Sequence, residues 1–263
     1  MLCKKYFTNS PIRSEVRAPS YIMRLKHSAG SGIGREICRV LARQGAKVIG
    51  TDRSLKSVQE TIASLSGSEH LALNVEVSNE QNIKEAFKQV ISKYATPPTI
   101  VVNSAGITRD QFILNLTNQE FDEVLDVNLK GTFYIIKTAV KEMIDADVNK
   151  GASIINISSI TGNLGNIGQA NYAASKAGVI ALTKTAALEF GQFGVRVNTV
   201  LPGFIETPMT ETVPENVKRI FLKKIALQRT GKPEEVAEVV TFLASNKSSY
   251  VNGTSIEVTG GIY

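Results

Sequence analysis

A tyrosine and a lysine lie four residues apart in the segment NYAASKAG, at Tyr172 and Lys176. In a helix this spacing places both side chains on one face, one turn apart. A free tyrosine, whose pKa is about 10, is a poor acid or base near neutral pH. A neighbouring ammonium group stabilises the phenolate and lowers that pKa, so the pair predicts a tyrosine that acts as general acid and base. A pair of solvated surface residues is the alternative.

The glycine-rich segment AGSGIG, residues 29–34, directly precedes and enters a helical pattern. Glycines let a pyrophosphate approach the backbone, and a helix N-terminus offers free N–H groups. The segment departs from the usual G-x-G-x-x-G fingerprint, because Arg35 occupies the place of its third glycine. It predicts a dinucleotide site, with a turn that binds no ligand as the alternative. The expected contacts are Gly30, Ser31, Gly32, Ile33 and Gly34.

The nucleotide preference of such a site depends on Asp52, which ends a predicted strand 18 residues after Gly34. A carboxylate there can accept hydrogen bonds from the adenosine ribose hydroxyls, and it repels a 2′-phosphate. NAD is therefore the expected cofactor. The adjacent Arg53 could accommodate that phosphate, which keeps NADP as an alternative. A solvated residue at a strand end is the structural alternative for Asp52.

Helical and strand-like segments alternate along the chain. The expected helices are 32–44, 54–65, 79–94, 117–145, 170–190 and 233–245. The expected strands are 20–26, 46–52, 70–78, 99–106, 152–159, 195–203 and 253–261. This alternation implies right-handed crossovers and an α/β fold, a single Rossmann-like doubly wound parallel sheet with helices on both faces. The turns that follow its strands would gather at one edge, where ligands of such sheets bind.

The tyrosine and lysine belong to a larger set of motifs that resembles the short-chain dehydrogenase/reductase family. Ser159 precedes Tyr172 by 13 residues, NSAG occupies 103–106, Asn128 begins NLKG, and PGFIETPM occupies 202–209. The resemblance covers roughly residues 30–263. It implies an enzyme that interconverts a secondary alcohol and a ketone with NAD, or with NADP.

The resemblance also implies a role for each matching residue. Ser159 would hold the substrate oxygen, and Tyr172 would exchange a proton with it. Lys176 would tune Tyr172 and bind the nicotinamide ribose, while Asn128 would hold a water that connects Lys176 to solvent. Ordinary packing is the alternative for Asn128 and for the contacts after residue 202. The further cofactor contacts that the family implies are Glu76, Val77, Asn103, Ala105, Gly106, Pro202, Gly203, Ile205 and Thr207.

Within the family, the segments 168–178, 194–209 and 258–261 look most like 3-oxoacyl-[acyl-carrier-protein] reductases and 17-beta-hydroxysteroid dehydrogenases of type 8. That likeness implies a 3-oxoacyl or (3R)-3-hydroxyacyl thioester as substrate, or a 17-beta-hydroxysteroid. It also implies acyl carrier protein as a candidate partner and a homo- or hetero-tetramer as the assembly.

Residues of about 204–230 are expected to form a substrate lid. Met209 and Phe221 are candidates for an acyl pocket, with ordinary core packing as the alternative. A basic group in the lid could dock a CoA or phosphopantetheine phosphate, although the solvated face of a helix is the favoured interpretation. This group consists of Lys218, Arg219, Lys223 and Lys224.

The basic character of the chain is confined to its N-terminal end. Residues 1–26 hold six lysines and arginines against one glutamate, whereas the whole chain has a net charge of +6. The nearly neutral remainder argues against nucleic acid as a partner. Residues 1–20 are therefore expected to be a basic extension, for targeting to the mitochondrial matrix or as an alternative start of a cytoplasmic protein. The family domain would span 21–263, with no metal site and no membrane span.

The predicted first strand departs from the family pattern. Ser28 occupies the place of the first glycine of T-G-x-x-x-G-x-G, and His27 that of the threonine. Arg24 and Lys26 fall on one face of a strand that should be apolar on both. Two hypotheses follow. The first is an active NAD-dependent oxidoreductase, and the alternative is a catalytically weak or silent member that acts as a partner subunit.

Overall fold

Seven parallel strands form the centre of the protein, of which the computed structural model describes residues 21–24 and 29–262. Their order in the sheet is β3-β2-β1-β4-β5-β6-β7. The strands are β1 (Tyr21–Arg24), β2 (Lys47–Asp52), β3 (Leu71–Asn74), β4 (Ile100–Asn103), β5 (Ser153–Ile157), β6 (Arg196–Pro202) and β7 (Ser255–Val258). The order reverses between β1 and β4, as in a doubly wound sheet, so the predicted fold class is confirmed.

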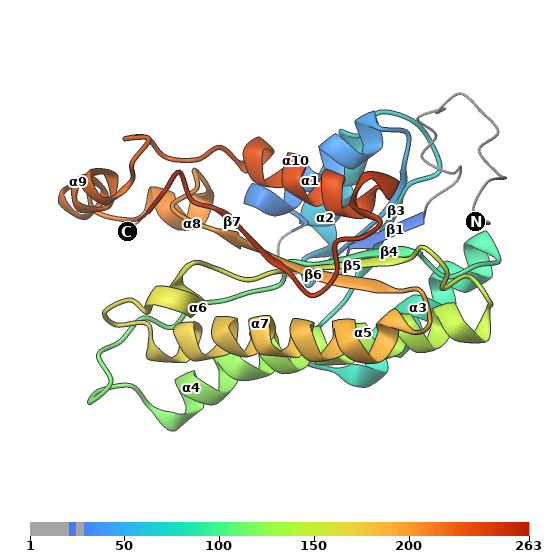
Figure 1. Ribbon diagram of the computed structural model, residues 1–263, viewed down its shortest axis with the longest axis horizontal. Helices are drawn as coiled ribbons and strands as arrows, with labels where there is room; N and C mark the ends of the chain where they lie inside the picture. The colour runs from blue at the N-terminus through green and yellow to red at the C-terminus, as the bar shows by residue number, and fades with distance from the viewer. Residues whose placement is uncertain (1–20, 25–28, 263) are drawn as a thin grey trace, which may run out of the picture.

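Helices cover both faces of this sheet, with α1 and α10 on one face and α3, α5 and α7 on the other (Figure 1). The α-helices are α1 (Gly32–Arg43), α2 (Leu55–Ala63), α3 (Glu80–Tyr94), α4 (Asn118–Leu125), α5 (Gly131–Asp145), α6 (Thr161–Leu164), α7 (Ala170–Gly191), α8 (Pro208–Glu211), α9 (Glu215–Lys224) and α10 (Pro233–Ala244). Two short elements, η1 (Asp126–Lys130) and η2 (Asn246–Ser248), are a π-helix and a 3₁₀-helix.

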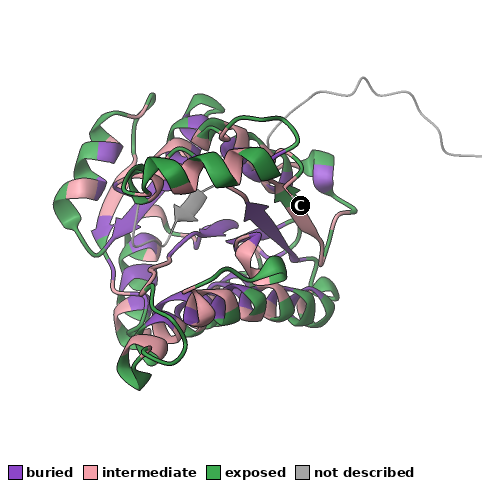
Figure 2. Ribbon diagram, turned by 90° about the vertical axis from the view of Figure 1, so that its left-hand side faces the viewer, coloured by how far each residue is buried: buried purple, intermediate pink, exposed green. Residues whose placement is uncertain are grey.

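The core consists of two apolar layers, one on each face of the sheet. Successive residues of a strand point to opposite faces, so Val101 packs in the layer under α5 and Val102 in the layer under α1. Ile154 and Ile155 alternate in the same way on β5. Figure 2 shows these central strands as the buried middle of the molecule. Strands that are apolar on both faces are what a parallel sheet between two helical layers requires.

The strand that the sequence put in doubt is formed. β1 lies in the middle of the sheet, where Ile22 is opposite both Val48 of β2 and Ile100 of β4. The backbone therefore makes the central strand that the family pattern needs, as far as Arg24. Outside the described residues lie Lys26, His27, Ser28 and the basic extension of residues 1–20.

The segment 117–145, expected as one helix, is divided by a π-helical turn. Thr117 begins α4 through a capping box with Glu120, and α4 runs directly into η1 and then α5. A π-helical turn accommodates one extra residue. Such turns are rare in proteins, and those that occur are often found at functional sites. Here the turn carries Asn128, which is fully buried. Residues 203–230, for which the sequence predicts irregular or helical structure, contain α8 and α9, while the short α6 was not predicted.

Candidate active site

The segments that follow β1, β4, β5 and β6 meet at the carboxyl edge of the sheet. A β-carbon added to Gly32, after β1, would lie 3.3 Å from the Thr207 side chain, after β6. One added to Gly106, after β4, would lie 3.3 Å from the Nζ of Lys176 on α7. These close approaches place the glycine turn, the NSAG segment and the tyrosine helix around one site, as the parallel topology predicts.

Tyr172 and Ser159 form the candidate reactive pair of this site. Tyr172 lies on the first turn of α7, its side chain partly buried, and its hydroxyl is hydrogen-bonded to that of Ser159, which follows β5. The main-chain N–H of Tyr172 donates to Oδ1 of Asn171 at 2.7 Å, which fixes the start of the helix. A substrate oxygen placed between the two hydroxyls would receive hydrogen bonds from both.

The pKa of Tyr172 lies above its ordinary value of 10.0. Loss of hydration on burial is the main cause, the hydrogen bond to Ser159 acts in the opposite direction, and the carboxylate of Asp110 adds to the rise. The phenol is therefore protonated at neutral pH in the ligand-free protein. This form of the side chain can donate a proton to a carbonyl oxygen.

Lys176 is buried directly below the tyrosine ring. Its Nζ donates a hydrogen bond to the main-chain oxygen of Ile157 at 2.9 Å and lies 5.6 Å from the centre of the Tyr172 ring. Burial lowers the pKa of Lys176 from 10.5 to about 8. The causes that shift the pKa of Tyr172 in the ligand-free protein are burial, Ser159 and Asp110, and the ammonium of Lys176 is directed at a carbonyl. That Lys176 lowers the pKa of Tyr172 stays a prediction.

Asn128 links the loop after β4 to helix α7. Its Oδ1 accepts from the N–H of Ile107 at 2.9 Å, and its Nδ2 donates to the Ile107 oxygen at 3.1 Å and to Oγ of Ser175 at 3.0 Å. Its main-chain oxygen accepts from the Thr132 hydroxyl at 2.7 Å. The amide thus holds three elements together beside Lys176. The water-binding role that the family resemblance implies for Asn128 stays a prediction.

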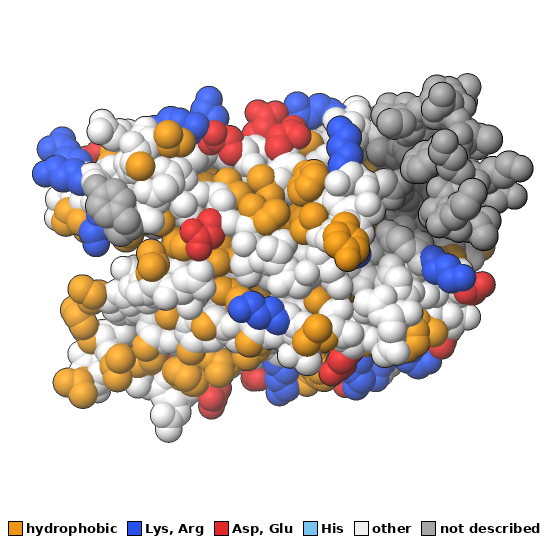
Figure 3. All heavy atoms as spheres, in the orientation of Figure 1, with side chains coloured by type: hydrophobic (Ala, Val, Ile, Leu, Met, Phe, Trp, Pro, Cys, Tyr) orange, Lys and Arg blue, Asp and Glu red, His pale blue; other side chains and the backbone are white. Residues whose placement is uncertain are grey.

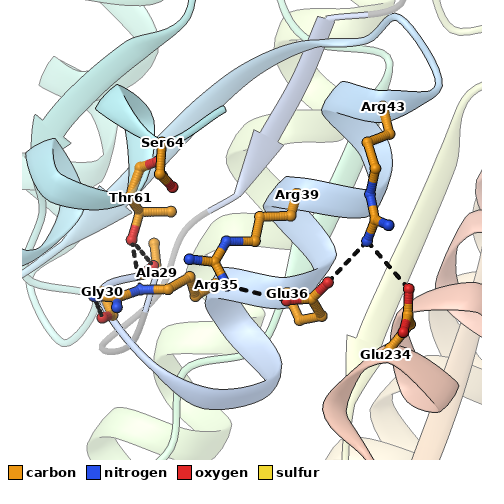
Figure 4. Close-up of polar contacts among 9 residues, drawn as sticks. All are labelled: Ala29, Gly30, Arg35, Glu36, Arg39, Arg43, Thr61, Ser64 and Glu234. Carbon is orange, nitrogen blue, oxygen red and sulfur yellow. Dashed lines mark hydrogen bonds and ion pairs between the residues drawn. The ribbon is translucent and has the colours of Figure 1, made fainter. Parts of the chain in front are cut away.

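Two carbonyl groups of the glycine turn accept side-chain hydrogen bonds (Figure 4), while the Gly30 N–H donates to Asp52. The hydroxyl of Thr61 donates to the Ala29 oxygen at 2.8 Å, and the guanidinium of Arg35 donates to the Gly30 oxygen. Helix α1 begins at Gly32, whose φ is +54°, and its N-cap residue Ser31 makes no side-chain capping bond. Unsatisfied N–H groups at a helix start are a favourable place for a phosphate.

Arg35 is a residue that the sequence reasoning missed. In the sequence it only departs from the glycine fingerprint, yet in the structure its side chain connects the turn to helix α2. Besides the bond to Gly30, its Nε donates to the Thr61 hydroxyl at 3.1 Å. The signal available in the sequence was its position four residues after Ser31, where a long side chain can reach back over the first turn.

Asp52 ends β2 directly beside the glycine turn. Its buried carboxylate accepts from the Gly30 N–H at 3.3 Å and from the Ser54 N–H at 2.9 Å, whereas Arg53 is exposed. Each carboxylate oxygen keeps further acceptor capacity after these bonds. The arrangement fits the ribose of a dinucleotide whose pyrophosphate lies at the turn.

The remaining residues before β5 lie around the sheet edge in different settings. The Glu76 carboxylate accepts from the Ser78 hydroxyl at 2.9 Å, and Val77 packs against Gly131 at the start of α5. Asn103 donates to Oδ1 of Asn156 at 2.8 Å, while its own Oδ1 is buried without a hydrogen-bond partner. The structure brings Gly106 to Lys176, and Ala105 beside it in the chain is buried.

The segment after β6 closes the site from the other side. The Gly203 N–H donates to the Val258 oxygen at 3.0 Å, and Ile205 is buried. Thr207 reaches Gly32 of the glycine turn, so Pro202 to Thr207 runs alongside the nucleotide site. Uncapped N–H groups, a carboxylate at the ribose place and a glycine against Lys176 together fit a nicotinamide dinucleotide. Among the described residues, no group of acidic, histidine or cysteine side chains is arranged to hold a metal ion.

A sheet of this topology, with a nucleotide turn at one strand end and a Ser–Tyr–Lys cluster at another, defines a nicotinamide-dependent oxidoreductase. A family model described as enoyl-(acyl carrier protein) reductase matches residues 28–263. The chain therefore belongs to the short-chain dehydrogenase/reductase family, which confirms the resemblance seen in the sequence.

Named relatives match most of this chain over most of their own length. The chain is 46% identical over 244 residues to the human (3R)-3-hydroxyacyl-CoA dehydrogenase, which is 89% of this chain and 93% of that protein. It is 48% identical over 244 residues to the same enzyme of the rat, with the same two coverages. It is 44% identical over 238 residues to the 3-oxoacyl-[acyl-carrier-protein] reductase FabG of Thermotoga maritima, which is 89% of this chain and 94% of that protein.

Proposed function

We propose that the protein interconverts 3-oxoacyl thioesters and (3R)-3-hydroxyacyl thioesters, with NAD rather than NADP as cofactor. The observation that carries this proposal is the hydrogen-bonded pair of Ser159 and Tyr172 above the buried Lys176. The names of the relatives, a 3-hydroxyacyl-CoA dehydrogenase and a 3-oxoacyl reductase, support the substrate class. Steroid alcohols are the second substrate class that the sequence resemblance implies.

The proposed reaction depends on a proton that Tyr172 gives and takes. In the reducing direction, Ser159 holds the ketone oxygen and the protonated phenol donates to it. In the oxidising direction, the phenolate removes the hydroxyl proton, and Lys176 and Asn128 provide the route by which that proton leaves. The nicotinamide cofactor supplies or accepts the hydride, and its oxidised ring brings a positive charge that favours the phenolate. The turn at Gly30 to Gly34 would hold its pyrophosphate.

The preference for NAD rests on Asp52. Its carboxylate lies beside the glycine turn, where the 2′-phosphate of NADP would come close to a buried negative charge. The hydroxyls of an NAD ribose can instead donate to it. Glu76 and Val77 are proposed beside the adenine, and Ile205 and Thr207 beside the nicotinamide carboxamide.

The alternative of a silent partner subunit gains no support from relatives that are named for dehydrogenase and reductase activities. The physical reasons for it were the charged first strand and the serine at position 28. The backbone of β1 nevertheless pairs on both sides in the middle of the sheet. The residues proposed for catalysis, Ser159, Tyr172, Lys176 and Asn128, are also all present.

Residues 204–230 are proposed as the substrate lid of the domain that spans 21–263. Phe204 and Phe221 stack with ring centres 5.1 Å apart, which joins α9 to the end of β6. Met209 on α8 is exposed, and the two residues before it, Thr207 and Pro208, approach Gly32 of the nucleotide turn. The basic residues of α9 lie on the outer side of this lid, over which blue side chains gather in Figure 3. Their docking of a CoA phosphate stays a prediction.

An assembly of several copies is proposed through helices α5 and α7. These helices border a groove of about 510 Å³ whose lining includes the exposed Phe133 and Ile144. Lys141 and Glu189 line the same groove, so a second copy related by two-fold symmetry could pair opposite charges across it. Exposed apolar surface with paired charges at its rim is typical of an interface between subunits.

The compartment is proposed from the basic end of the chain, whose composition is typical of a mitochondrial targeting segment. No helix of the described part of the chain has the length and apolar character that crossing a membrane demands. Imaging of the full chain with a fluorescent C-terminal fusion tests the mitochondrial matrix against the cytoplasm.

The experiment that tests the proposed function is a substrate and cofactor panel on the purified full chain. Acetoacetyl-CoA, estradiol and testosterone are each assayed with the NAD and NADP forms of the cofactor, after titration of NADH binding by fluorescence. We expect micromolar NADH binding and turnover of acetoacetyl-CoA that is at least about tenfold faster with NADH than with NADPH. Absence of NADH binding, or turnover of steroids alone, would contradict the proposal.

A further inference from the structure

The loop after β4 is tied to the turn that leads into the tyrosine helix. The N–H of Gln111 donates to the Gly168 oxygen at 2.8 Å, and Gln111 and Gln169 form an isolated parallel bridge. The Asn171 amide donates to the Arg109 oxygen at 2.9 Å. In Figure 1 these two segments lie together at the end of the molecule where α6 and α7 begin. The loop is therefore anchored to the start of the helix that carries Tyr172.

Asp110 is the acidic residue of this junction. Its Oδ2 accepts from Nε2 of Gln169 at 3.0 Å, and Gln169 is three residues before Tyr172. The amide of Gln169 is oriented by a second bond, since Nδ2 of Asn166 donates to its Oε1 at 2.9 Å. A neutral amide thus holds the carboxylate in place without cancelling its charge.

The cations near Asp110 have other partners. The guanidinium of the adjacent Arg109 forms two bonds with the Glu123 carboxylate, at 2.6 Å and 3.0 Å. Lys176 is buried and donates to Ile157. Of the three influences on the pKa of Tyr172, that of the Asp110 carboxylate is the smallest, and it raises that pKa. Asp110 itself is exposed, on the solvent side of the site.

We propose that Asp110 is a specificity-determining residue, which disfavours substrates that carry a negative charge close to the ketone. A free 3-oxo acid places its carboxylate two bonds from the carbonyl carbon that reacts, whereas a thioester is neutral at that place. Coulomb repulsion between two carboxylates then selects the thioester. This inference rests on the proposed function, because it assumes that the reacting ketone lies between Ser159 and Tyr172.

The matched substrates for a test are the N-acetylcysteamine thioester of acetoacetate, which is neutral, and acetoacetate itself. Acetoacetate is measured as a substrate and as a competitive inhibitor of thioester reduction, so that binding is observed even without turnover. The variant Asp110→Asn removes the charge and keeps an oxygen that accepts from Gln169. We expect it to improve kcat/KM or the inhibition constant for acetoacetate about three- to tenfold, with the thioester changed less than about twofold.

Three controls separate charge from structure. Asp122→Asn removes an exposed carboxylate from α4 and should leave the ratio of the two substrates unchanged. Gln169→Ala removes the bond but keeps the charge of Asp110, so it should lower kcat for both substrates without changing their ratio. Because exposed charges are screened, the gain of Asp110→Asn should also shrink in about 1 M salt.

The two proposals fail in different ways. A wild-type protein that does not reduce the thioester would contradict the proposed function. A wild-type protein that reduces it, while Asp110→Asn leaves the ratio unchanged, would overturn the role of Asp110 alone. The role is equally overturned by a ratio that Asp122→Asn changes as much, or by one that is insensitive to salt.

Discussion

The Nζ of Lys176 lies 5.6 Å from the centre of the Tyr172 ring, and its hydrogen bond goes to the main chain of β5 and not to the phenol. Each member of the pair is therefore shifted by burial toward its neutral form, Tyr172 upward and Lys176 downward in pKa. The residues of the chain alone favour a protonated phenol. In the ligand-free site Tyr172 is thus a protonated phenol, which is the form that can donate a proton in ketone reduction.

Replacement of Tyr172 by phenylalanine tests the proton-transfer role. Without the hydroxyl, no acid is left beside Ser159, so kcat should fall by about 10²- to 10⁴-fold. NADH affinity should stay within a few fold, because the ring still packs over Lys176. Steady-state kinetics and fluorescence titration check both numbers. Tyr134→Phe on α5 is the matched control and should leave kcat unchanged; substantial turnover by Tyr172→Phe would reject the assignment.

Replacement of Asp52 by alanine tests the cofactor preference. The ribose hydroxyls lose a charged acceptor, a loss of about 1.5–3 kcal/mol, which is about tenfold to a hundredfold in kcat/KM for NADH. NADPH should be used better than by the wild type, because the repulsion of its phosphate is removed. In the double variant with Arg53→Ala that gain should diminish. If the NADH to NADPH ratio is the same in Asp52→Ala as in the wild type, another residue sets the preference.

Replacement of Arg35 by alanine tests the support of the glycine turn. The Gly30 carbonyl and the Thr61 hydroxyl lose their guanidinium partner, so the turn is less ordered before the dinucleotide binds. We expect NADH binding to weaken about five- to thirtyfold, the equivalent of about 1–2 kcal/mol. Arg39→Ala is the control, since this exposed arginine on α1 contacts only the surface carboxylate of Glu36 in Figure 4. Equal effects of the two variants would contradict the role of Arg35.

The sheet and most helices were predictable because their signals are local. The apolar run at 100–102 and the run at 154–155 can be buried only between two helical layers, and the glycines and prolines mark their ends. The pair of Tyr172 and Lys176 was predictable from its spacing on one helix face, whereas Ser159 was implied by the family resemblance. Parallel strands then bring the ends that carry these residues together.

The directions of individual side chains were not predictable. The hydrogen bond of Lys176 depends on the carbonyl of Ile157, which belongs to a strand 19 residues earlier. The role of Arg35 depends on Gly30 and on a helix that follows the next strand. The π-helical turn at Asn128 is selected by bonds to Ile107, since no local pattern separates it from a continuous helix. These side-chain directions are set by tertiary contacts, which the periodicity of the sequence does not reveal.

The lowered pKa of Lys176 should make the free energy of unfolding depend on pH. Its pKa is about 8 in the folded protein against an ordinary value of 10.5, a difference of about 3 kcal/mol. Between these values the unfolded chain holds a proton that the folded protein has released, so this lysine makes the unfolding free energy rise with pH. Below pH 8 both states are protonated, and the full cost of burying the charge is present.

Lys176→Met removes that cost and also the hydrogen bond to Ile157, which is worth about 1 kcal/mol. The variant should therefore be more stable than the wild type by about 1–2 kcal/mol below pH 8, an advantage that disappears as pH approaches 10. The raised pKa of Tyr172 has the opposite effect, because above pH 10 the tyrosine of the unfolded chain ionises before that of the folded protein and the unfolding free energy falls. The comparison of the two proteins therefore ends at pH 10. Urea unfolding at several pH values from 6 to 10 measures the difference. Lys184→Met, at an exposed position of α7, should show no such pH dependence, and a constant offset for Lys176→Met would mean that the buried amine keeps its ordinary pKa.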